Sequence, residues 1–264
     1  MKIRFVCVLL MAVLALSLTA CGKLKAKDQL NKGIQAYKDK EYEDAEKFFA
    51  EATKLDPDLD LAWENLAQAK LQQISSSMSN VADKEKALGA VEVYQRLKET
   101  RKSSSAYRNI AKLYARLTQC QKSIITEDEM NQFIQKARDS ILEWQKVDPE
   151  NKEPLAMMGE FVITLSDREL RDKGIQRNSD LDRLEDAEYL PILTKVDEGL
   201  KFYADASKKD PNDVKIIEGL IVAYNQKMWL TKDYTQWEEL NKALGDLKMK
   251  RYQLKSKPAE PKPA

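Results

Sequence analysis

The chain has 264 residues, with 44 Lys and Arg, 43 Asp and Glu, and no histidine. A formal net charge of +1 excludes a strong, charge-driven hold on nucleic acid. The missing histidine excludes Ser-His-Asp triads, Cys-His nucleophiles and HExxH metal sites. Charged residues make up 33% and hydrophobic residues 43%, with only 8 Gly and 8 Pro. This composition is typical of a charged, soluble, helical body.

The first segment of the chain, residues 1–20, has the pattern of a signal peptide. Lys2 and Arg4 precede an almost unbroken apolar run from Phe5 to Ala20. That run is shorter than the roughly 20 residues that a helix needs to cross the hydrocarbon of a bilayer. A basic start, a short apolar stretch and small residues at its end predict a cleaved signal peptide. The alternative is an uncleaved anchor helix that happens to be followed by a cysteine.

The end of this segment, Leu18-Thr19-Ala20-Cys21, resembles the lipobox of bacterial lipoproteins. The resemblance implies cleavage before Cys21 and acylation of its thiol, with chains such as palmitate, so that residues 21–26 form a lipidated linker. Each buried methylene of such an anchor contributes about 0.8 kcal/mol. The expected location is the bacterial cell envelope, with the soluble domain exported. Gly22, which replaces the aspartate of inner-membrane retention, favours the outer membrane facing the periplasm in a Gram-negative cell.

Three copies of one short sequence motif, Lys-x-Asp-Pro, divide the rest of the chain. They are Lys54-Leu55-Asp56-Pro57, Lys146-Val147-Asp148-Pro149 and Lys208-Lys209-Asp210-Pro211. Lysine stabilises the negative end of a helix dipole, and proline cannot continue a helix. Each motif therefore predicts the end of one amphipathic helix and the beginning of another.

The first repeat resembles the tetratricopeptide (TPR) motif. The residues that carry the resemblance are Gly33, Tyr37, Tyr42, Ala45, Phe49, Ala52 and Pro57, followed by Trp63, Leu66 and Ala67. A register based on the 34-residue TPR unit then finds weaker repeats downstream, with helices around Tyr107, Met158 and Ile217. The resemblance implies an all-α, TPR-like α-solenoid of about five antiparallel helical hairpins over residues 27–254. The Pro- and Lys-containing residues 255–264 are expected to be a disordered tail.

Three insertions interrupt the repeats. The serine-containing segment 72–83 is expected to be a loop within the second hairpin. The segment 118–128 is expected to be a shorter loop, with Thr126 as an N-cap. The charged segment 166–188 has two interpretations, which are a helical extension and a mobile loop.

The sequence contains no motif that indicates catalysis or a cofactor. Asp56-x-Asp58-x-Asp60 resembles the start of a calcium loop, but Leu61 and Ala67 occupy the required glycine and glutamate positions. We therefore expect no enzymatic activity, no cofactor and no metal. Carboxylate pairs such as those of a cell-wall hydrolase are abundant in so charged a chain, and no pair is singled out.

The TPR register places two groups of side chains in the groove where such solenoids bind partners. The first group is Lys27, Leu30, Ile34, Tyr37 and Lys38, and the second is Arg108, Lys112 and Arg116. The second group lies four residues apart on one helix face and could hold a carboxylate or an acidic peptide. An ordinary solvated helix face is the alternative interpretation.

These features together predict a membrane-anchored, non-catalytic scaffold or adaptor. Its partner would be an envelope protein or peptide, its membrane contact would be the lipid anchor, and it would bind no nucleic acid. The alternative is a ligand-binding TPR accessory component of a solute transporter.

The lipid anchor can be tested by one substitution. Cys21→Ala removes the thiol that would be acylated, so the protein should leave the membrane fraction or be mis-processed. Membrane fractionation and mass spectrometry of the N-terminal peptide measure this. Unchanged fractionation would contradict the lipobox.

Overall fold

The structure is a computed structural model that describes residues 22–75, 78–101, 104–121, 123–175, 180–181 and 184–256. Within these ranges the chain forms helices joined by turns and no strand, which confirms the all-α prediction. A first helix covers residues 22–38. It is followed by α2 (Tyr42–Leu55), α3 (Asp60–Gln72), α4 (Val81–Arg101), α5 (Ser104–Leu117), α6 (Glu127–Val147), α7 (Glu153–Asp172), α8 (Asp186–Lys209), α9 (Val214–Leu230) and α10 (Tyr234–Ser256).

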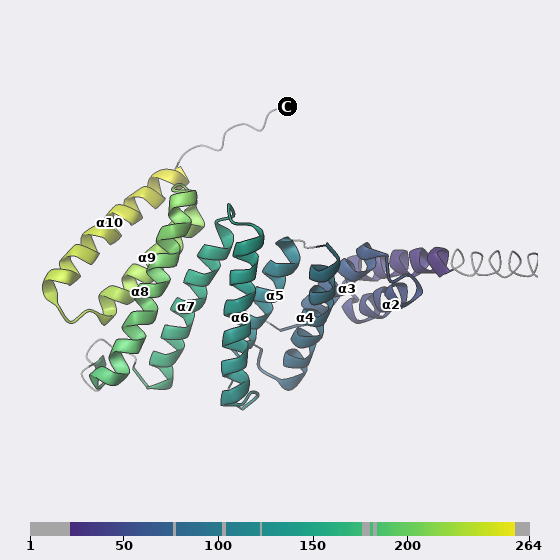
Figure 1. Ribbon diagram of the computed structural model, residues 1–264, viewed down its shortest axis with the longest axis horizontal. Helices are drawn as coiled ribbons and strands as arrows, with labels where there is room; N and C mark the ends of the chain where they lie inside the picture. Colours follow the sequence, from purple (N-terminus) through teal and green to yellow (C-terminus); the bar gives the residue numbers. More distant parts are fainter. Residues whose placement is uncertain are drawn as a thin grey trace, which may run out of the picture. The chain divides into compact units, whose positions relative to one another are not determined.

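The helices belong to two compact units, Met1–Ser140 and Ile141–Ala264, with the boundary inside α6. In the first unit α3 packs against α2 and α4, and α4 packs against α5. In the second unit α8 packs against both α7 and α9, and α9 packs against α10 (Figure 1). Helices that follow one another in the sequence are therefore neighbours in space within each unit, as a chain of helical hairpins requires.

The three Asp-Pro motifs end helices, as the sequence predicts. α2 ends at Leu55, α6 at Val147 and α8 at Lys209, so an aspartate follows the last helical residue each time. The backbone N–H of Asp56 donates to the Ala52 carbonyl (3.0 Å), and that of Asp210 donates to the Ala206 carbonyl (3.3 Å). The proline that follows has no N–H to continue this ladder.

Close packing in the first repeat depends on a glycine that faces an aromatic ring. A Cβ at Gly33 would lie 2.5 Å from Cε1 of Phe49, which is itself fully buried. Ala45 and Ala52, which the TPR motif also requires, are fully buried in α2. Small side chains on one helix thus leave room for the aromatic side chain of its partner.

The second unit repeats this arrangement around Tyr203 of α8. A Cβ at Gly159 of α7 would lie 2.8 Å from the Tyr203 ring, and one at Gly219 of α9 would lie 2.2 Å from it. The ring therefore lies between two glycines and touches both neighbouring helices. Burial raises the pKa of the Tyr203 hydroxyl far above its usual value, which keeps it neutral.

The three segments predicted as insertions differ in how much of each is helical in the structure. Residues 73–80 connect α3 to α4, and α6 begins at Glu127 after a turn. Thr126 caps α6: its hydroxyl accepts from the Glu129 N–H (3.1 Å), and Glu129 in turn accepts from the Thr126 N–H (2.9 Å). This is a reciprocal capping box. Of segment 166–188, residues 166–172 extend α7 and residues 186–188 begin α8.

The two ends of the repeat region differ from the expected boundaries. Residues 22–26, which we expected to be a linker, are the first turn and a half of the helix over 22–38. Lys255 and Ser256, which we placed in the tail, are the last residues of α10. The signal peptide, Cys21 and residues 257–264 lie outside the described residues. Within the described part of the chain, no helix combines the length and the apolar character needed to cross a membrane.

The packing of Gly33 predicts opposite effects for two glycine substitutions in the first unit. Gly33→Ala should lower the free energy of unfolding by about 1–3 kcal/mol, because the new methyl group overlaps the Phe49 ring. Gly89→Ala in α4 is the matched control, since a Cβ there meets only Lys70 Nζ at 3.6 Å. It should stabilise the helix by roughly 0.5–1 kcal/mol. Urea denaturation followed by circular dichroism measures both, and equal effects would contradict the packing argument.

Candidate functional site

The first predicted groove group lies on the helix over residues 22–38. Lys27 and Lys38 are exposed, and Ile34 and Tyr37 are half-buried. Leu30, which the register also placed in the groove, is only 6% exposed and belongs to the core. The Tyr37 ring packs edge-on against Tyr42 with centroids 5.2 Å apart. The first group therefore presents two charged and two partly apolar side chains.

The second predicted group is on α5, where the structure separates its three members. Arg116 is half-buried and donates from Nη2 to the Ser75 carbonyl (2.8 Å), so it holds the loop between α3 and α4. Lys112 is exposed. Arg108 is half-buried and lines a cavity. Of the three, Arg108 is thus the one that the fold places in a candidate binding site.

This cavity, of about 300 Å³, lies among α3, α4 and α5 in the first unit. We call it the α3–α5 cavity. Its lining is Leu61, Glu64, Asn65, Gln68, Tyr94, Leu97, Ser105, Ala106, Arg108 and Asn109. The α3 members stand three or four residues apart, so they share one helix face. Glu64 adds an acidic side chain to the lining, so the lining is not purely basic.

Tyr94 of α4 is a buried member of this lining. Its side chain is only 3% exposed, and its hydroxyl accepts a hydrogen bond from Gln68 Nε2 (3.0 Å). Burial raises the pKa of Tyr94 to about 12, while a side-chain hydrogen bond with Asn109 opposes the rise. The positive charge of Arg108 lowers the pKa of this hydroxyl, and the negative charge of Glu64 raises it.

Sequence reasoning missed the neutral members of the cavity. Asn65, Gln68 and Asn109 are uncharged amides that form no charge pattern, and Tyr94 looks like an ordinary packing aromatic. The one usable indication was the spacing of Leu61, Glu64, Asn65 and Gln68 on the exposed face of a predicted helix. Burial of Ala62, Leu66 and Ala67 on the opposite face of α3 confirms that spacing.

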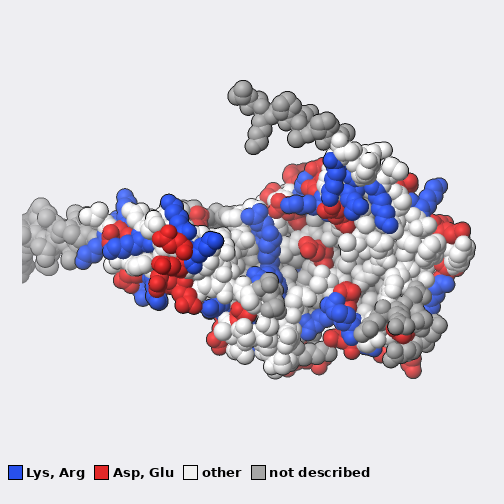
Figure 2. Space-filling view, turned by 180° about the vertical axis from the view of Figure 1, so that it is seen from behind, with Lys and Arg blue, Asp and Glu red and all other residues white. Residues whose placement is uncertain are grey.

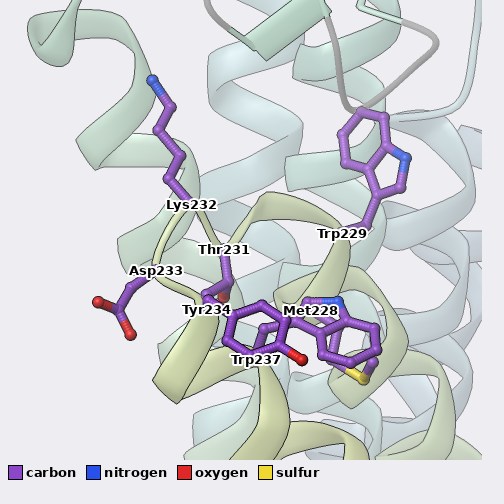
Figure 3. Close-up of a pocket in the computed structure, with 7 residues that line it drawn as sticks. All are labelled: Met228, Trp229, Thr231, Lys232, Asp233, Tyr234 and Trp237. Atoms are coloured by element: carbon purple, nitrogen blue, oxygen red, sulfur yellow. The ribbon is translucent and has the colours of Figure 1, made fainter.

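A second cavity, of about 490 Å³, lies at the junction of α9 and α10 in the second unit. Its lining is Met228, Trp229, Thr231, Lys232, Asp233, Tyr234 and Trp237. Figure 3 shows Tyr234 and Trp237 gathered near Met228, whereas Lys232 and Asp233 extend away from them. The Lys232 ammonium lies 5.0 Å from the centroid of the Tyr189 ring instead. The polar groups of this cavity therefore do not converge on one point.

No arrangement for metal binding accompanies these cavities. In the part of the chain that the structure describes, no three His, Cys, Asp or Glu side chains are grouped so that they could hold a metal ion. The cavities offer amides, aromatic rings and a few charges, which are groups suited to hydrogen bonding and packing.

Comparison with solved structures supports the fold. A structure titled "Crystal structure of MamA protein" superposes with a TM-score of 0.53 at 11% identity, covering 91% of this chain and 97% of that chain. A second, "MamA RS-1 ArsTM double mutant", has a TM-score of 0.50 at 13% identity, covering 87% and 97%. A thermophilic TPR protein of Thermus thermophilus, TTC0263, has 20% identity and a TM-score of 0.39, covering 75% and 98%.

Comparisons of the sequence found no match, either to a protein-family model or to a curated protein. The structural likeness shows the fold alone. Together with the glycine–aromatic packing of consecutive helices, it identifies the described chain as an all-α, TPR-like solenoid.

The loop between α3 and α4 predicts a pH effect on stability. The Asp83 carboxylate accepts hydrogen bonds from the hydroxyl and the N–H of Ser75, and the hydroxyl bond is the main cause of its lowered pKa. Because the folded pKa lies below the unfolded value of about 3.9, this stabilisation is complete above that value and is lost as the pH falls through the folded pKa.

Asp83→Asn should therefore lower the melting temperature near neutral pH and lose less stability than wild type below about pH 4. Thermal unfolding from pH 7 to pH 3, followed by circular dichroism, measures both curves. Glu85→Gln, on an exposed residue two positions along α4, is the control. Parallel curves for wild type and Asp83→Asn would show that the carboxylate does not have this role.

Proposed function

We propose that this chain is a non-catalytic adaptor that binds a segment of a partner protein in the α3–α5 cavity. The observation that carries the proposal is the lining of that cavity. It combines two asparagines, an arginine and a glutamate with the apolar side chains of Leu61 and Leu97. Such a mixture suits a peptide better than a metal or a reacting substrate.

An extended peptide presents both N–H and C=O groups, and the lining can pair with both. The amide side chains of Asn65 and Asn109 each donate and accept hydrogen bonds. The Arg108 guanidinium can pair with a carboxylate or a carbonyl oxygen of the same segment. A volume of about 300 Å³ admits a few side chains, so the bound element would be a short segment.

The lipobox-like residues Leu18 to Cys21 supply the second half of the proposal. A chain acylated at Cys21 would be a lipoprotein of the bacterial envelope, with its helical repeats exported and, in a Gram-negative cell, facing the periplasm from the outer membrane. Confinement to a membrane raises the effective concentration of an adaptor near its partners. Such an anchor would allow even a weak, partly polar binding site to be occupied, because it keeps the site close to partners in the same membrane.

Binding of a small ligand, as in an accessory component of a solute transporter, is the second candidate. It is favoured by the size of the α3–α5 cavity, which lies at the lower end of the range of about 300–1,000 Å³ for ligand sites. A stoichiometric small molecule seen by native mass spectrometry of the purified protein would support it.

Crosslinking in intact cells, followed by affinity purification and mass spectrometry, tests the adaptor function. Wild type should recover an envelope protein. Combined Arg108→Ala and Asn109→Ala should reduce that recovery about tenfold or more, since a hydrogen bond to a charged group contributes about 1.5–3 kcal/mol. Lys112→Ala, one turn along α5 and outside the cavity lining, is the matched control. Equal recovery from all variants would show that the cavity is not the binding site.

A further inference from the structure

The last helix of the second unit, α10, leaves large apolar side chains in contact with solvent. Tyr234 is 71% exposed, Trp237 37%, Met249 59% and Tyr252 69%. Leu240 and Leu244, on another side of α10, pack onto a cluster that includes Ile217 and Ile221 of α9. Figure 1 shows α10 beside α9. Several large apolar side chains exposed on one helix mark a candidate interaction surface.

The exposed side chains are aligned along one face of the helix. Tyr234, Trp237, Asn241, Gly245, Lys248 and Tyr252 follow one another at intervals of three or four residues, with Met249 beside them. We call these residues the outer face of α10. Gly245 lies near its middle, and a Cβ at that position would meet nothing within 4 Å. The outer face therefore has a shallow centre between two aromatic ends.

Charge is divided along the same helix. The acidic residues Asp233, Glu238 and Glu239 stand at its beginning, and the basic residues Lys242, Lys248, Lys250 and Arg251 follow, with Asp246 as the exception. Figure 2 shows basic and acidic side chains intermixed over the surface of the described chain as a whole. Lys255 is already paired with Glu218 at 2.6 Å. α10 thus carries an acidic half and a basic half.

We propose that the outer face of α10 binds the same face of a second copy of this chain, with the two helices antiparallel. Reversal of one helix brings the acidic half of each copy beside the basic half of the other. Tyr234 and Tyr252 lie equally far from position 243, as do Asn241 and Gly245. In a two-fold interface each member of such a pair meets the other, so one helix supplies both complementary surfaces.

The proposed interface buries a small area, so the dimer is expected to be weak. A helix of 23 residues is about 35 Å long, so two such helices bury an area near the lower limit for a stable dimer. The dimer is therefore concentration-dependent, and Gly245 allows the helix axes to approach closely at its centre.

Cysteine crosslinking of the full chain in intact cells tests this pairing. Two differently tagged copies, one with Asn241→Cys and one with Gly245→Cys, should form a mixed disulfide dimer after mild oxidation. The matched control replaces Gly245→Cys with Asp246→Cys, an exposed neighbour that points to another side of α10. Wild type gives the background of the native cysteines. Equal crosslinking of control and test pairs, or a product with a different protein, would overturn the proposal.

A charge exchange distinguishes self-pairing from the binding of another partner. Glu238→Lys alone and Lys248→Glu alone should each reduce the Asn241–Gly245 crosslink several-fold, because each brings like charges together in an antiparallel pair. The two changes combined in every copy should restore the crosslink. Failure of the double variant to recover, with an unchanged circular dichroism melting curve, would overturn the antiparallel arrangement.

Discussion

The close approach of neighbouring helices, made possible where a glycine faces an aromatic ring, is the contact on which both units depend. Phe49 occupies the space left by Gly33, and Tyr203 fills the space between Gly159 and Gly219. These contacts tolerate no added methyl group, since protein interiors are packed without spare volume. They hold consecutive helices at a fixed spacing, and the groove residues are positioned by that spacing.

Much of this architecture could be predicted from the sequence, because its determinants are local. The Asp-Pro motifs stop helices through backbone chemistry that needs no tertiary context, and Thr126 with Glu129 forms a cap within four residues. The hairpin order follows from repeat spacing. The first-helix boundary was harder, because nothing in residues 22–26 except composition distinguishes a linker from the beginning of a helix.

The candidate site was only partly predictable, since its members come together from three helices. The α5 residues Arg108 and Arg116 share one face in the sequence, yet one lines a cavity and the other holds a loop carbonyl. The difference is decided by Ser75, about forty residues away in the chain. Tyr94, Asn65 and Asn109 line the cavity only because α3, α4 and α5 pack together. No local sequence pattern identifies these neighbouring helices. The all-α fold is therefore better determined by sequence than the chemistry on its surface.

The helix over residues 22–38 begins directly after the residue to which a lipid would be attached. A flexible tether of n residues allows its cargo to range over a distance that grows roughly as the square root of n, and here n is close to zero. Under the proposed anchoring, the beginning of this helix would stay within a few ångströms of the headgroups, and the first repeat could reach no farther from them than its own length. Partners would have to come to the membrane surface, and the orientation of the first repeat would be set by the direction in which its first helix leaves the bilayer.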